Sequence, residues 1–523
     1  MNKSKTDSVE KQNTVEWKDI DWRKVARCVF KLQKRIYKAV RCGNVKLARK
    51  LQRTLRRSWY NRLLAVCQAT QDNRGKNTAG VDGVKKKLTS KQRLELAERL
   101  KLTGKSKPTR RVWIPKPEKD EKRPLGISVM YDRALQGVVK ATLEPEWEAR
   151  FEPSSYGFRP GRSAQDAVRH IKDVIVNTPK YVLAADLAKC FDRINHVALL
   201  QKIGHIGTIR QQIRAWLKSG IIKKKEFSAT SEGTSQGGVI SPLLANIALH
   251  GLEEEIKQMA ETQPNECFEK SVGGNKAKKR MSITLIRYAD VFLVLHSSKS
   301  VVLRCREIIS DWLHGIGLEL KPETNRLTHT LHSSESEDGK AGFDFLAYHI
   351  QQYPASKYKV GKNPGNGVQK TFKTLITPSK KNQQNHLDSI KTKLSSLKQA
   401  PQEKVISELN PIIRGWSSYF TFSDAQTVGI FTKMNYLLYK RLRRWGKRQC
   451  HGSVKDAHKK FWHKKRNRNW VFGVKDGKSK LVMNLVSYGI NGAKSTGYVK
   501  VKGDNSPYDG DELYWSARLN TLK

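Results

Sequence analysis

The chain has 523 residues, of which 38% are hydrophobic, so it can form roughly three or four domains with sizeable cores. Lys and Arg number 100 against 48 Asp and Glu, and the formal net charge is therefore +52. A surface of this sign is neutralised by a polyanion, because each cation that meets a phosphate releases a condensed counterion. The sequence has no run of about 18 apolar residues, which argues against membrane insertion and leaves nucleic acid as the expected partner.

The cysteines argue against two further classes of protein. They are scattered, form no Cys-x-x-Cys pair, and are Cys28, Cys42, Cys67, Cys190, Cys267, Cys305 and Cys450. Neither a disulfide framework nor a zinc module is therefore predicted. The first residues, MNKSKTDSVEKQ, lack the apolar stretch of a secretory signal, and a reducing, cytosol-like compartment is expected.

The segment 17–71 follows a polar leader and is predicted to be helical. Its apolar residues recur at three- and four-residue steps between basic ones, and they include Val25, Val29, Leu32, Ile36 and Val40. A basic helical hairpin packed on a core fits this pattern, and so does an extension that grips a nucleic-acid template. The charge alone does not separate these two interpretations.

The segment from Trp113 to about Ile350 predicts an α+β domain. Short β-rich runs, YVLAAD, ITLIRYADVFLVL and GFDFLAYHI, alternate with helical stretches such as 163–176 and 242–259. Polar residues 262–279 are expected to form a surface insertion, and residues 333–370 to be loop-like around the GFDFL strand. Beyond Pro378 the chain is again predicted to be helical, and it is strongly basic and rich in Trp.

Two of the apolar strands end in an aspartate. They are Tyr181-Val-Leu-Ala-Ala-Asp186 and Ile283-Thr-Leu-Ile-Arg-Tyr-Ala-Asp290. A carboxylate at the end of a buried strand is costly unless a cation offsets it. Two such carboxylates can together hold divalent metals about 4 Å apart for phosphoryl chemistry. Each aspartate alone is more often a cap or turn residue, so the surrounding sequence has to decide.

The surroundings of both aspartates resemble the polymerase motifs of reverse transcriptases. VLAADLAKCFDRINH, which contains Asp186, resembles motif A, and SQGGVISPLLAN resembles motif B. Tyr288-Ala-Asp-Val291 lies where the Tyr-x-Asp-Asp signature belongs, with Asp290 placed 104 positions after Asp186. RPLGI and SYGFRPGRS upstream are similar to the fingers motifs of group II intron enzymes, and LNPIIRGW downstream is similar to their maturase, or thumb, signature. The resemblance runs from about Trp17 to the C-terminus.

This resemblance implies an α+β, right-hand polymerase fold and a two-metal Mg²⁺ site with Asp186 and Asp290 as the catalytic metal ligands. It places Phe191 under the sugar of the incoming nucleotide, where a ring excludes a 2′-hydroxyl, although a core aromatic fits this residue equally well. The remaining nucleotide-binding candidates are Lys116 and Arg123 for the triphosphate, and Gln236 and Gly237 for the template–nucleotide pair.

The sequence departs from the family at the polymerase site. Val291 stands where the family has a second aspartate, and it supplies neither a ligand nor a charge. Thr324 stands where the family has a basic residue, and Ser235 where proline is usual. Loss of one electrostatic contribution costs about a hundred- to thousand-fold in rate, so polymerisation is expected to be severely reduced. The Cys and His cluster of an HNH endonuclease is also missing, and no DNA cleavage is expected.

The C-terminal part of the chain, by contrast, keeps the maturase signature of the family, whose residues here are Arg414, Gly415, Trp416 and Tyr419. Cations interleaved with Trp in 441–448 and 461–470 suit phosphate contact and base stacking, although a solvated helix face is the alternative for any single charge run. The RNA-binding candidates are Arg159, Arg162, Arg414, Trp416, Arg441, Arg443, Arg444, Lys464 and Arg466. Arg159 and Arg162 could equally pair with Asp166. Residues 506–515 resemble the family's DNA-contacting region.

The predicted domains are a basic helical N-terminal extension (1–90), fingers and palm (91–370), a thumb or maturase domain (371–475) and a C-terminal DNA-binding region (476–523). The expected function is that of a maturase, which binds its own group II intron RNA and promotes splicing and retrohoming into target DNA, in a bacterial cytoplasm or an organelle. The alternatives are an active RNA-directed DNA polymerase that uses dNTPs, and a repurposed RNA-binding scaffold with no intron of its own.

Overall fold

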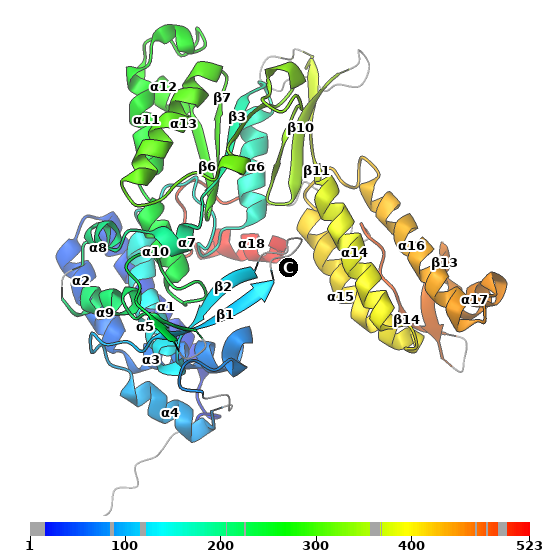
Figure 1. Cartoon of the computed structure of the whole chain (residues 1–523), viewed down its shortest axis with the longest axis horizontal. Helices are drawn as coiled ribbons and strands as arrows, with labels where there is room; N and C mark the ends of the chain where they lie inside the picture. The colour runs from blue at the N-terminus through cyan, green and yellow to red at the C-terminus, as the bar shows by residue number, and fades with distance from the viewer. Residues whose placement is uncertain are drawn as a thin grey trace, which may run out of the picture.

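The computed structural model describes residues 16–83, 88–115, 122–205, 207–223, 226–355, 367, 369–465, 468–476, 480–489 and 499–522. Figure 1 shows a body with the N-terminal helices and fingers at one end and the palm at the other, and a thumb that projects from one side of this body. The right-hand polymerase arrangement expected from the sequence is thus the observed fold.

The N-terminal helices and the long fingers helix form one bundle. Its members are α1 (Trp22–Arg41), α2 (Val45–Arg57), α3 (Trp59–Cys67), α4 (Ser90–Arg99) and α5 (Met130–Glu148). Helix α1 begins after Asp21, whose side chain accepts a hydrogen bond from the amide of Lys24, and it buries the apolar stripe of Val25, Val29 and Ile36. The predicted helical character of this segment is confirmed.

The fingers carry a small sheet in the order β2-β1-β4-β5. Its strands are β1 (Thr109–Pro115), β2 (Lys122–Ile127), β4 (Ile221–Lys223) and β5 (Glu226–Ser228). Strands β1 and β2 are antiparallel, with Arg111 opposite Gly126, whereas β4 joins β1 in parallel. The sheet therefore combines a local hairpin with a strand from far along the chain.

The palm contains an antiparallel sheet in the order β6-β7-β3-β8. Its strands are β3 (Tyr181–Asp186), β6 (Thr284–Tyr288), β7 (Val291–His296) and β8 (Arg326–His329). Leu183 belongs to one hydrophobic cluster and Val182 to another, because successive strand residues point to opposite faces. Both faces are therefore covered, which explains why these strands are continuous apolar runs rather than alternating ones.

The described palm and adjoining fingers contain eight further helices. They are α6 (Ala164–Ile175), α7 (Cys190–Arg193), α8 (His196–Ile203), α9 (Thr208–Leu217), α10 (Ser241–Leu249), α11 (Leu252–Thr262), α12 (Lys276–Ser282) and α13 (Lys299–His314). Of these, α6 and α13 pack directly on the palm sheet. The stretch 242–259, predicted as one helix, is divided between α10 and α11. Gly251 has a φ of 101°, which lies in the left-handed region and ends helical continuity.

The described residues 333–355 contain more regular structure than the sequence indicated. They contribute β9 (Phe343–Phe345) and β10 (Tyr348–Pro354), which form an antiparallel sheet with β11 (Phe372–Pro378). Leu346 and Ala347 join the first two strands with positive φ values of 49° and 70°. This sheet connects the palm to the thumb (Figure 1).

The thumb is a bundle of long helices with a small sheet at its far end. The helices are α14 (Lys380–Ser396), α15 (Gln402–Phe420), α16 (Ile430–Gln449) and α17 (Val454–Phe461). The sheet has the order β12-β13-β14, with β12 (Trp462–Lys465), β13 (Arg468–Lys475) and β14 (Leu481–Asn484). The sequence predicted the helices but not this sheet, because its strands are interrupted by Lys and Arg and lack a clear alternation.

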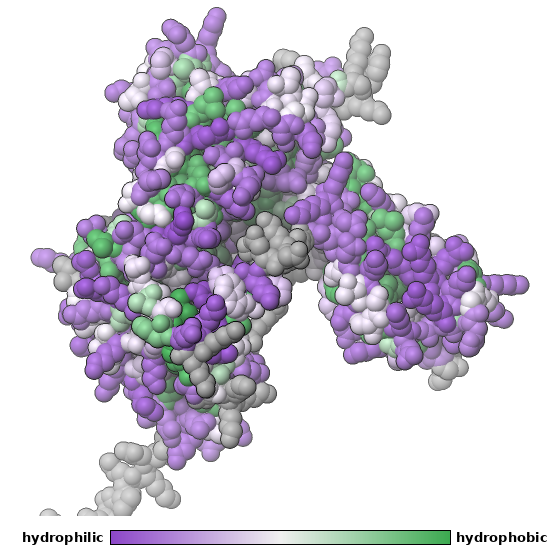
Figure 2. Space-filling model, in the orientation of Figure 1, coloured by the Kyte–Doolittle hydropathy of each residue, from purple (hydrophilic) through white to green (hydrophobic). Residues whose placement is uncertain are grey.

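The C-terminal segment, 499–522, returns to the body and ends in α18 (Glu512–Leu522), which lies between the palm and the fingers (Figure 1). Space-filling representation shows an open notch between body and thumb and a largely hydrophilic surface on both (Figure 2). Within the described ranges, no helix combines the length and the apolar character needed to cross a membrane.

Candidate active site and nucleic-acid interface

The end of the palm sheet brings two aspartates to adjacent strand ends. Asp186 is the last residue of β3, and β3 pairs with β7 so that Asp186 lies opposite Val291. Strands β6 and β7 form a hairpin whose turn contains Ala289 and Asp290. The amide of Leu187, which follows Asp186, donates to the carbonyl oxygen of Asp290 at 3.1 Å. The backbones that carry the two carboxylates are therefore directly connected.

Burial dominates the electrostatics of Asp290. It raises the pKa of this carboxyl above the ordinary value, while a hydrogen bond that the carboxyl accepts from its own backbone amide and the positive charge of Arg123 act in the opposite direction. A desolvated carboxylate is stabilised by a nearby cation, and carboxylate oxygens are ligands that Mg²⁺ prefers. The donor set of Asp186 and Asp290 therefore fits a divalent cation. Among the described residues, no group of three or more His, Cys, Asp or Glu could hold a metal.

Val291 is half-buried and packs against the apolar cluster that contains Ile286 and Leu293. Directly opposite residues of an antiparallel pair point to the same face, so the valine side chain lies beside that of Asp186. Its two methyl groups occupy a position where a carboxylate would lie next to those of Asp186 and Asp290.

Thr324 lies in a short 3-10 turn, Pro322–Thr324, close to the end of β3. Its hydroxyl donates to the carbonyl oxygen of Lys321 at 3.3 Å, so it serves the turn itself. The amide of Lys321 donates to the carbonyl oxygen of Asp186 at 2.8 Å, whereas its ammonium group lies 3.6 Å from Glu323. The backbone of Lys321 is thus bonded to that of Asp186, which places a cationic residue near the aspartate at a position that the sequence did not predict.

Phe191 lies where the palm core meets the surface. Its ring is half-buried against the palm core and packs edge to face with Phe158, with 6.2 Å between the ring centroids. Phe158 is exposed and has a φ of 61°. The two rings therefore extend from the palm core to the surface, close in sequence to the strand that ends in Asp186.

The loop that contains Gln236 and Gly237 is held between the palm and the fingers. The side-chain amide of Gln236 donates to Asp192 at 2.8 Å, and the carbonyl oxygen of Gln236 accepts from the amide of Gly126 on β2 at 2.7 Å. Gly237 has a φ of 102°, which a residue with a Cβ rarely adopts. The backbone conformation of this loop is therefore fixed from two sides.

The two cations expected at the triphosphate have different positions. Arg123 is an exposed residue of β2, and its charge reaches Asp290 across the gap between fingers and palm. Lys116 lies outside the described residues. The structure therefore brings one of the two predicted phosphate ligands toward the strand-end aspartates.

The RNA-binding prediction for Arg159 and Arg162 requires correction, because both side chains are buried. Arg159 forms a bidentate ion pair with Glu148, with both N–O distances at 3.0 Å. Arg162 donates to the carbonyl oxygens of Pro153 at 2.6 Å and Gly503 at 2.8 Å. Their donors face the interior, so neither side chain presents a guanidinium group to an RNA phosphate.

The prediction that these arginines could pair with Asp166 is also wrong. Asp166 is fully buried, forms a capping box with Ser163 at the start of α6, and is paired with Arg518 of α18. This ion pair connects the palm to the C-terminal segment, and its two residues are 352 positions apart in the sequence.

Trp416 likewise has an interior position. Its indole N–H donates to Asn382 at 2.8 Å, and its ring stacks on His386 with 4.8 Å between centroids. Phe420, Phe431 and Tyr488 complete the aromatic cluster around it, and Trp416 is 9% exposed. The prediction that this ring stacks on RNA is corrected: in the described arrangement it forms part of the core of the thumb.

The remaining thumb cations are largely at the surface. Arg414, Arg443, Arg444 and Lys464 are exposed. Arg441 is half-buried and donates to the carbonyl oxygen of Leu387 at 2.8 Å, and Arg466 lies outside the described residues. Trp470 is 66% exposed and packs edge to face on His458, so it is an aromatic group available beside these cations.

The C-terminal aromatic residues are used within the protein. The hydroxyl of Tyr508 donates to Glu144 of α5 at 3.0 Å, and its ring packs against Phe30 of α1. Trp515 is buried, and a Cβ added at Gly161 would overlap its ring. The segment that resembles a DNA-contacting region is thus docked on the body.

One buried pair escaped the sequence analysis. Arg287, on β6, is fully enclosed and donates to the side-chain oxygen of Asn246 at 2.9 Å. The available signal was a charged residue inside the apolar run ITLIRYAD, since buried charges require partners.

Three family models match the chain in succession. The N-terminal domain of reverse transcriptase matches residues 17–100, and reverse transcriptase (RNA-dependent DNA polymerase) matches residues 114–350. The maturase-specific domain of group II introns matches residues 383–470. Together they cover the N-terminal bundle, the fingers and palm, and most of the thumb.

Curated relatives show the same pattern. Protein YkfC of Escherichia coli is 31% identical over 327 residues, which cover 58% of this chain and 83% of that protein. The group II intron-encoded protein LtrA of Lactococcus lactis is 27% identical over 432 residues, or 71% and 70% of the two chains. Maturase-like protein 1 of Euglena gracilis is 26% identical over 422 residues, or 78% of each chain.

Proposed function

The chain belongs to the family of group II intron-encoded reverse transcriptases and maturases, and from this premise we propose that it is a maturase that binds its own intron RNA. In this proposal the protein holds the intron in its splicing-competent fold, while the RNA supplies the splicing chemistry. It also assists retrohoming into target DNA, within a bacterial cytoplasm or an organelle.

The exposed cations of the thumb carry this proposal. Arg414 on α15 and Arg443 and Arg444 on α16 lie at the surface of a helical bundle whose interior is well packed. A rigid scaffold that presents guanidinium groups suits the recognition of phosphates at fixed spacing. Lys464 and the partly buried Arg441 add further cations of the thumb, and Arg466, which lies outside the described residues, is proposed as an RNA contact from its sequence alone. Binding should therefore weaken steeply with salt, because counterions are released on association.

The polymerase half is proposed to be impaired. Asp186 and Asp290 would hold Mg²⁺, which when bound activates a primer hydroxyl and neutralises the departing pyrophosphate. Lys116, Arg123, Phe191, Gln236 and Gly237 would contact the incoming dNTP or the template pair. Val291 leaves the carboxylate set one member short, and Thr324 leaves the nearby turn without the family's cation.

The experiment that tests the maturase proposal is a splicing assay. The RNA that flanks the reading frame is transcribed and incubated at low Mg²⁺, with and without the purified chain. We expect splicing at least tenfold faster with protein, and we expect Arg414→Ala combined with Arg443→Ala and Arg444→Ala to lose most of this stimulation. An unchanged splicing rate with wild-type protein would contradict the proposal.

A second candidate function is that of an active RNA-directed DNA polymerase. It is favoured by one observation, the connection of the Asp186 and Asp290 backbones at the strand ends. Primer extension on an RNA template separates the two candidates, because robust synthesis by the wild-type chain would contradict the impaired site.

A further inference from the structure

Two segments that lie far from β6 in the sequence converge beside the turn that carries Asp290. They are the loop 154–158 and helix α10 at Asn246, and both contact Arg287 at the end of β6. The amide of Arg287 donates to the carbonyl oxygen of Ser154 at 3.0 Å, and its carbonyl oxygen accepts from the amide of Tyr156 at 2.8 Å. The loop is thus paired with β6 immediately before the turn.

The Arg287 guanidinium links helix α10 to the turn through a single nitrogen. Its Nη1 atom donates to Oδ1 of Asn246 at 2.9 Å and lies 3.4 Å from the carbonyl oxygen of Ala289, within the turn itself. Burial lowers the pKa of Arg287 to about 10, with the charge of Glu152 acting in the opposite direction, so the group is still a cation at neutral pH. Such a buried cation holds its hydrogen-bond acceptors tightly.

Asn246 completes the connection. Its side-chain Nδ2 donates to the carbonyl oxygen of Gly157 at 2.8 Å. A Cβ at Gly157 would overlap the backbone nitrogen of Ala289, so this loop is in direct contact with the turn. Ala289 itself has a φ of 58°, a conformation that costs about 1 kcal/mol or more for a residue with a Cβ and persists only when its surroundings enforce it.

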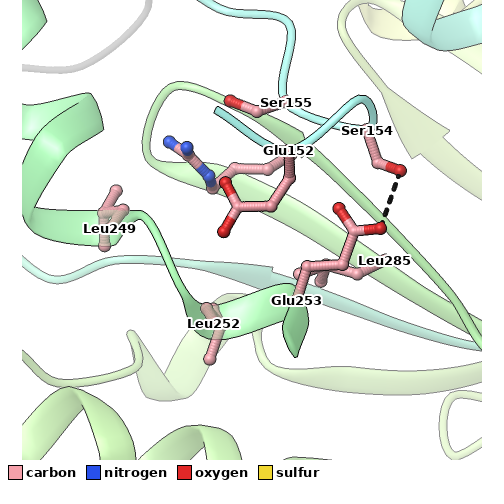
Figure 3. Close-up of a pocket in the computed structure, with 8 residues that line it drawn as sticks. Glu152, Ser154, Ser155, Leu249, Leu252, Glu253 and Leu285 are labelled. Atoms are coloured by element: carbon pink, nitrogen blue, oxygen red, sulfur yellow. Dashed lines mark hydrogen bonds between the residues drawn. The ribbon is translucent and has the colours of Figure 1, made fainter. Parts of the chain in front are cut away.

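The same arginine lines a small pocket beside the β6–β7 hairpin. Figure 3 shows Glu152, Ser154 and Ser155 on one side of this pocket, and Leu249, Leu252 and Glu253 on the other. The Nη2 atom of Arg287 and the hydroxyl of Ser155 are buried without a hydrogen-bond partner in the described part of the chain. In the described residues, the hydrogen bonds of the guanidinium to Asn246 and to the turn are therefore both made by Nη1.

We propose that Arg287 and Asn246 form a buried clamp that fixes the strained turn at Ala289 and so positions Asp290 to bind a divalent cation. Arg287 and Asn246 act as positioning residues, since neither would touch the metal. This inference rests on the metal role of Asp186 and Asp290 in the proposed function, and it does not depend on whether polymerisation survives. It predicts that the clamp controls metal affinity without affecting RNA binding.

The test uses Mn²⁺ as the probe and the full-length chain. Titration followed by the electron paramagnetic resonance of free Mn²⁺ gives the number and affinity of bound ions, and the site of interest is the one lost in Asp290→Asn. We expect Arg287→Met to weaken this site at least tenfold, and Arg287→Lys, which restores one cationic donor, to recover part of the loss. The double variant Arg287→Met with Asn246→Leu should be no weaker than Arg287→Met alone, because residues of one network are not additive.

Arg280→Met is the matched control. Arg280 is a surface arginine of α12 that is paired with Glu254 and Glu261, so its loss should leave Mn²⁺ affinity unchanged. Affinity for intron RNA and a cooperative thermal transition report whether each variant is folded. If Arg287→Met does not fold, Asn246→Asp replaces it, because this change keeps an oxygen for Arg287 and removes the donor to Gly157, while the charge it adds is offset by the buried Arg287 cation; a threefold weakening is then expected.

Wild-type Mn²⁺ affinity in folded Arg287→Met, or in Asn246→Asp when that variant is the one tested, would overturn the clamp. Absence of any Asp290-dependent Mn²⁺ site in the wild-type chain would overturn it as well. Neither result would affect the maturase proposal, which fails separately if the protein does not stimulate splicing.

Discussion

Asp186 and Val291 face each other across the antiparallel pairing of β3 and β7. Side chains at directly opposite positions lie on the same face of a sheet, with Cβ atoms about 4.5–5.5 Å apart. A carboxylate at position 291 would therefore be adjacent to Asp186 and one residue from Asp290. Val291 therefore places an apolar side chain beside the two aspartates at the strand ends.

Val291→Asp should raise the rate of primer extension on an RNA template by about tenfold to a hundred-fold, because a restored electrostatic contribution of this kind is worth that much or more. The measurement is single-turnover extension with Mg²⁺ and with Mn²⁺. Val291→Asn, which has the same shape without the charge, is the control and should show little gain. Equal rates for Asp and Asn would indicate that charge at this position is not what the site lacks, and Thr324→Lys would then be the next variant.

The buried ion pair of Asp166 with Arg518 should be essential for docking the C-terminal segment. Both side chains are almost fully enclosed, so removing one leaves an uncompensated buried charge, at a cost of about 3–5 kcal/mol. Arg518→Met should lower the free energy of unfolding by this amount in urea titrations, and it should expose 499–511 to protease.

Lys34→Met is the control for this prediction. Lys34 pairs with Glu512 at 2.8 Å, but the glutamate is 80% exposed, so the loss should be within about 1 kcal/mol. Similar losses from Arg518→Met and Lys34→Met would contradict the role assigned to the buried pair.

The meeting of Asp186 and Asp290 could be predicted from sequence because its signals are local. An apolar run that ends in an aspartate is visible in a few residues, and a hairpin brings such strand ends to one edge. The tight turn at Ala289 and Asp290 follows from the short spacing between the two strands.

Burial at single positions could not be predicted in the same way. Arg414 and Trp416 are two residues apart in one signature, yet the first is exposed and the second is in the core. The partner of Asp166 is separated from it by 352 positions, and no local pattern records such a contact. The helical character predicted beyond Pro378 does not hold for Trp462–Lys465 and Arg468–Lys475, which are strands, because cations on a strand and on a helix look alike without an apolar period.

The stability of the N-terminal bundle should fall in acid through Glu146. Burial alone would raise the pKa of Glu146, but the hydrogen bond and charge of His205, with Arg49 and Gln52, outweigh it and hold the pKa at about 2. A carboxyl whose folded pKa lies below the ordinary 4.5 contributes stability that is complete above about pH 5 and is lost as pH falls toward 2. The contribution is on the order of 3 kcal/mol at pH 7.

Glu146→Gln should therefore be less stable than wild type at pH 7, and the difference in unfolding free energy should shrink when urea titrations are repeated at pH 4 and pH 3. Glu408→Gln is the matched control. Hydrogen bonds from Lys393 and Lys404 also hold the pKa of Glu408 at about 2, but this carboxylate is at the surface, where solvent and salt screen it. A constant difference for Glu146→Gln across this pH range would contradict the assignment.

Neighbouring residues of the thumb signature should separate stability from RNA binding. Trp416→Ala removes a buried ring from the aromatic cluster with His386 and Tyr488, and a loss of about 3–5 kcal/mol is expected in urea unfolding of the thumb. Arg414→Ala should leave this free energy within about 0.5 kcal/mol of wild type, since its side chain is exposed.

Among variants that fold normally, RNA binding should show the opposite order, with the larger effect from Arg414→Ala. Filter binding of intron RNA over a series of KCl concentrations gives the slope of log affinity against log salt, and Arg414→Ala should reduce this slope by about one unit if the guanidinium meets a phosphate. Ser418→Ala, an exposed position on the same helix, is the control and should change neither the slope nor the stability. An unchanged slope in Arg414→Ala would remove this residue from the RNA-binding surface, and the exposed pair Arg443 and Arg444 on α16 would then have to account for the phosphate contacts of the thumb.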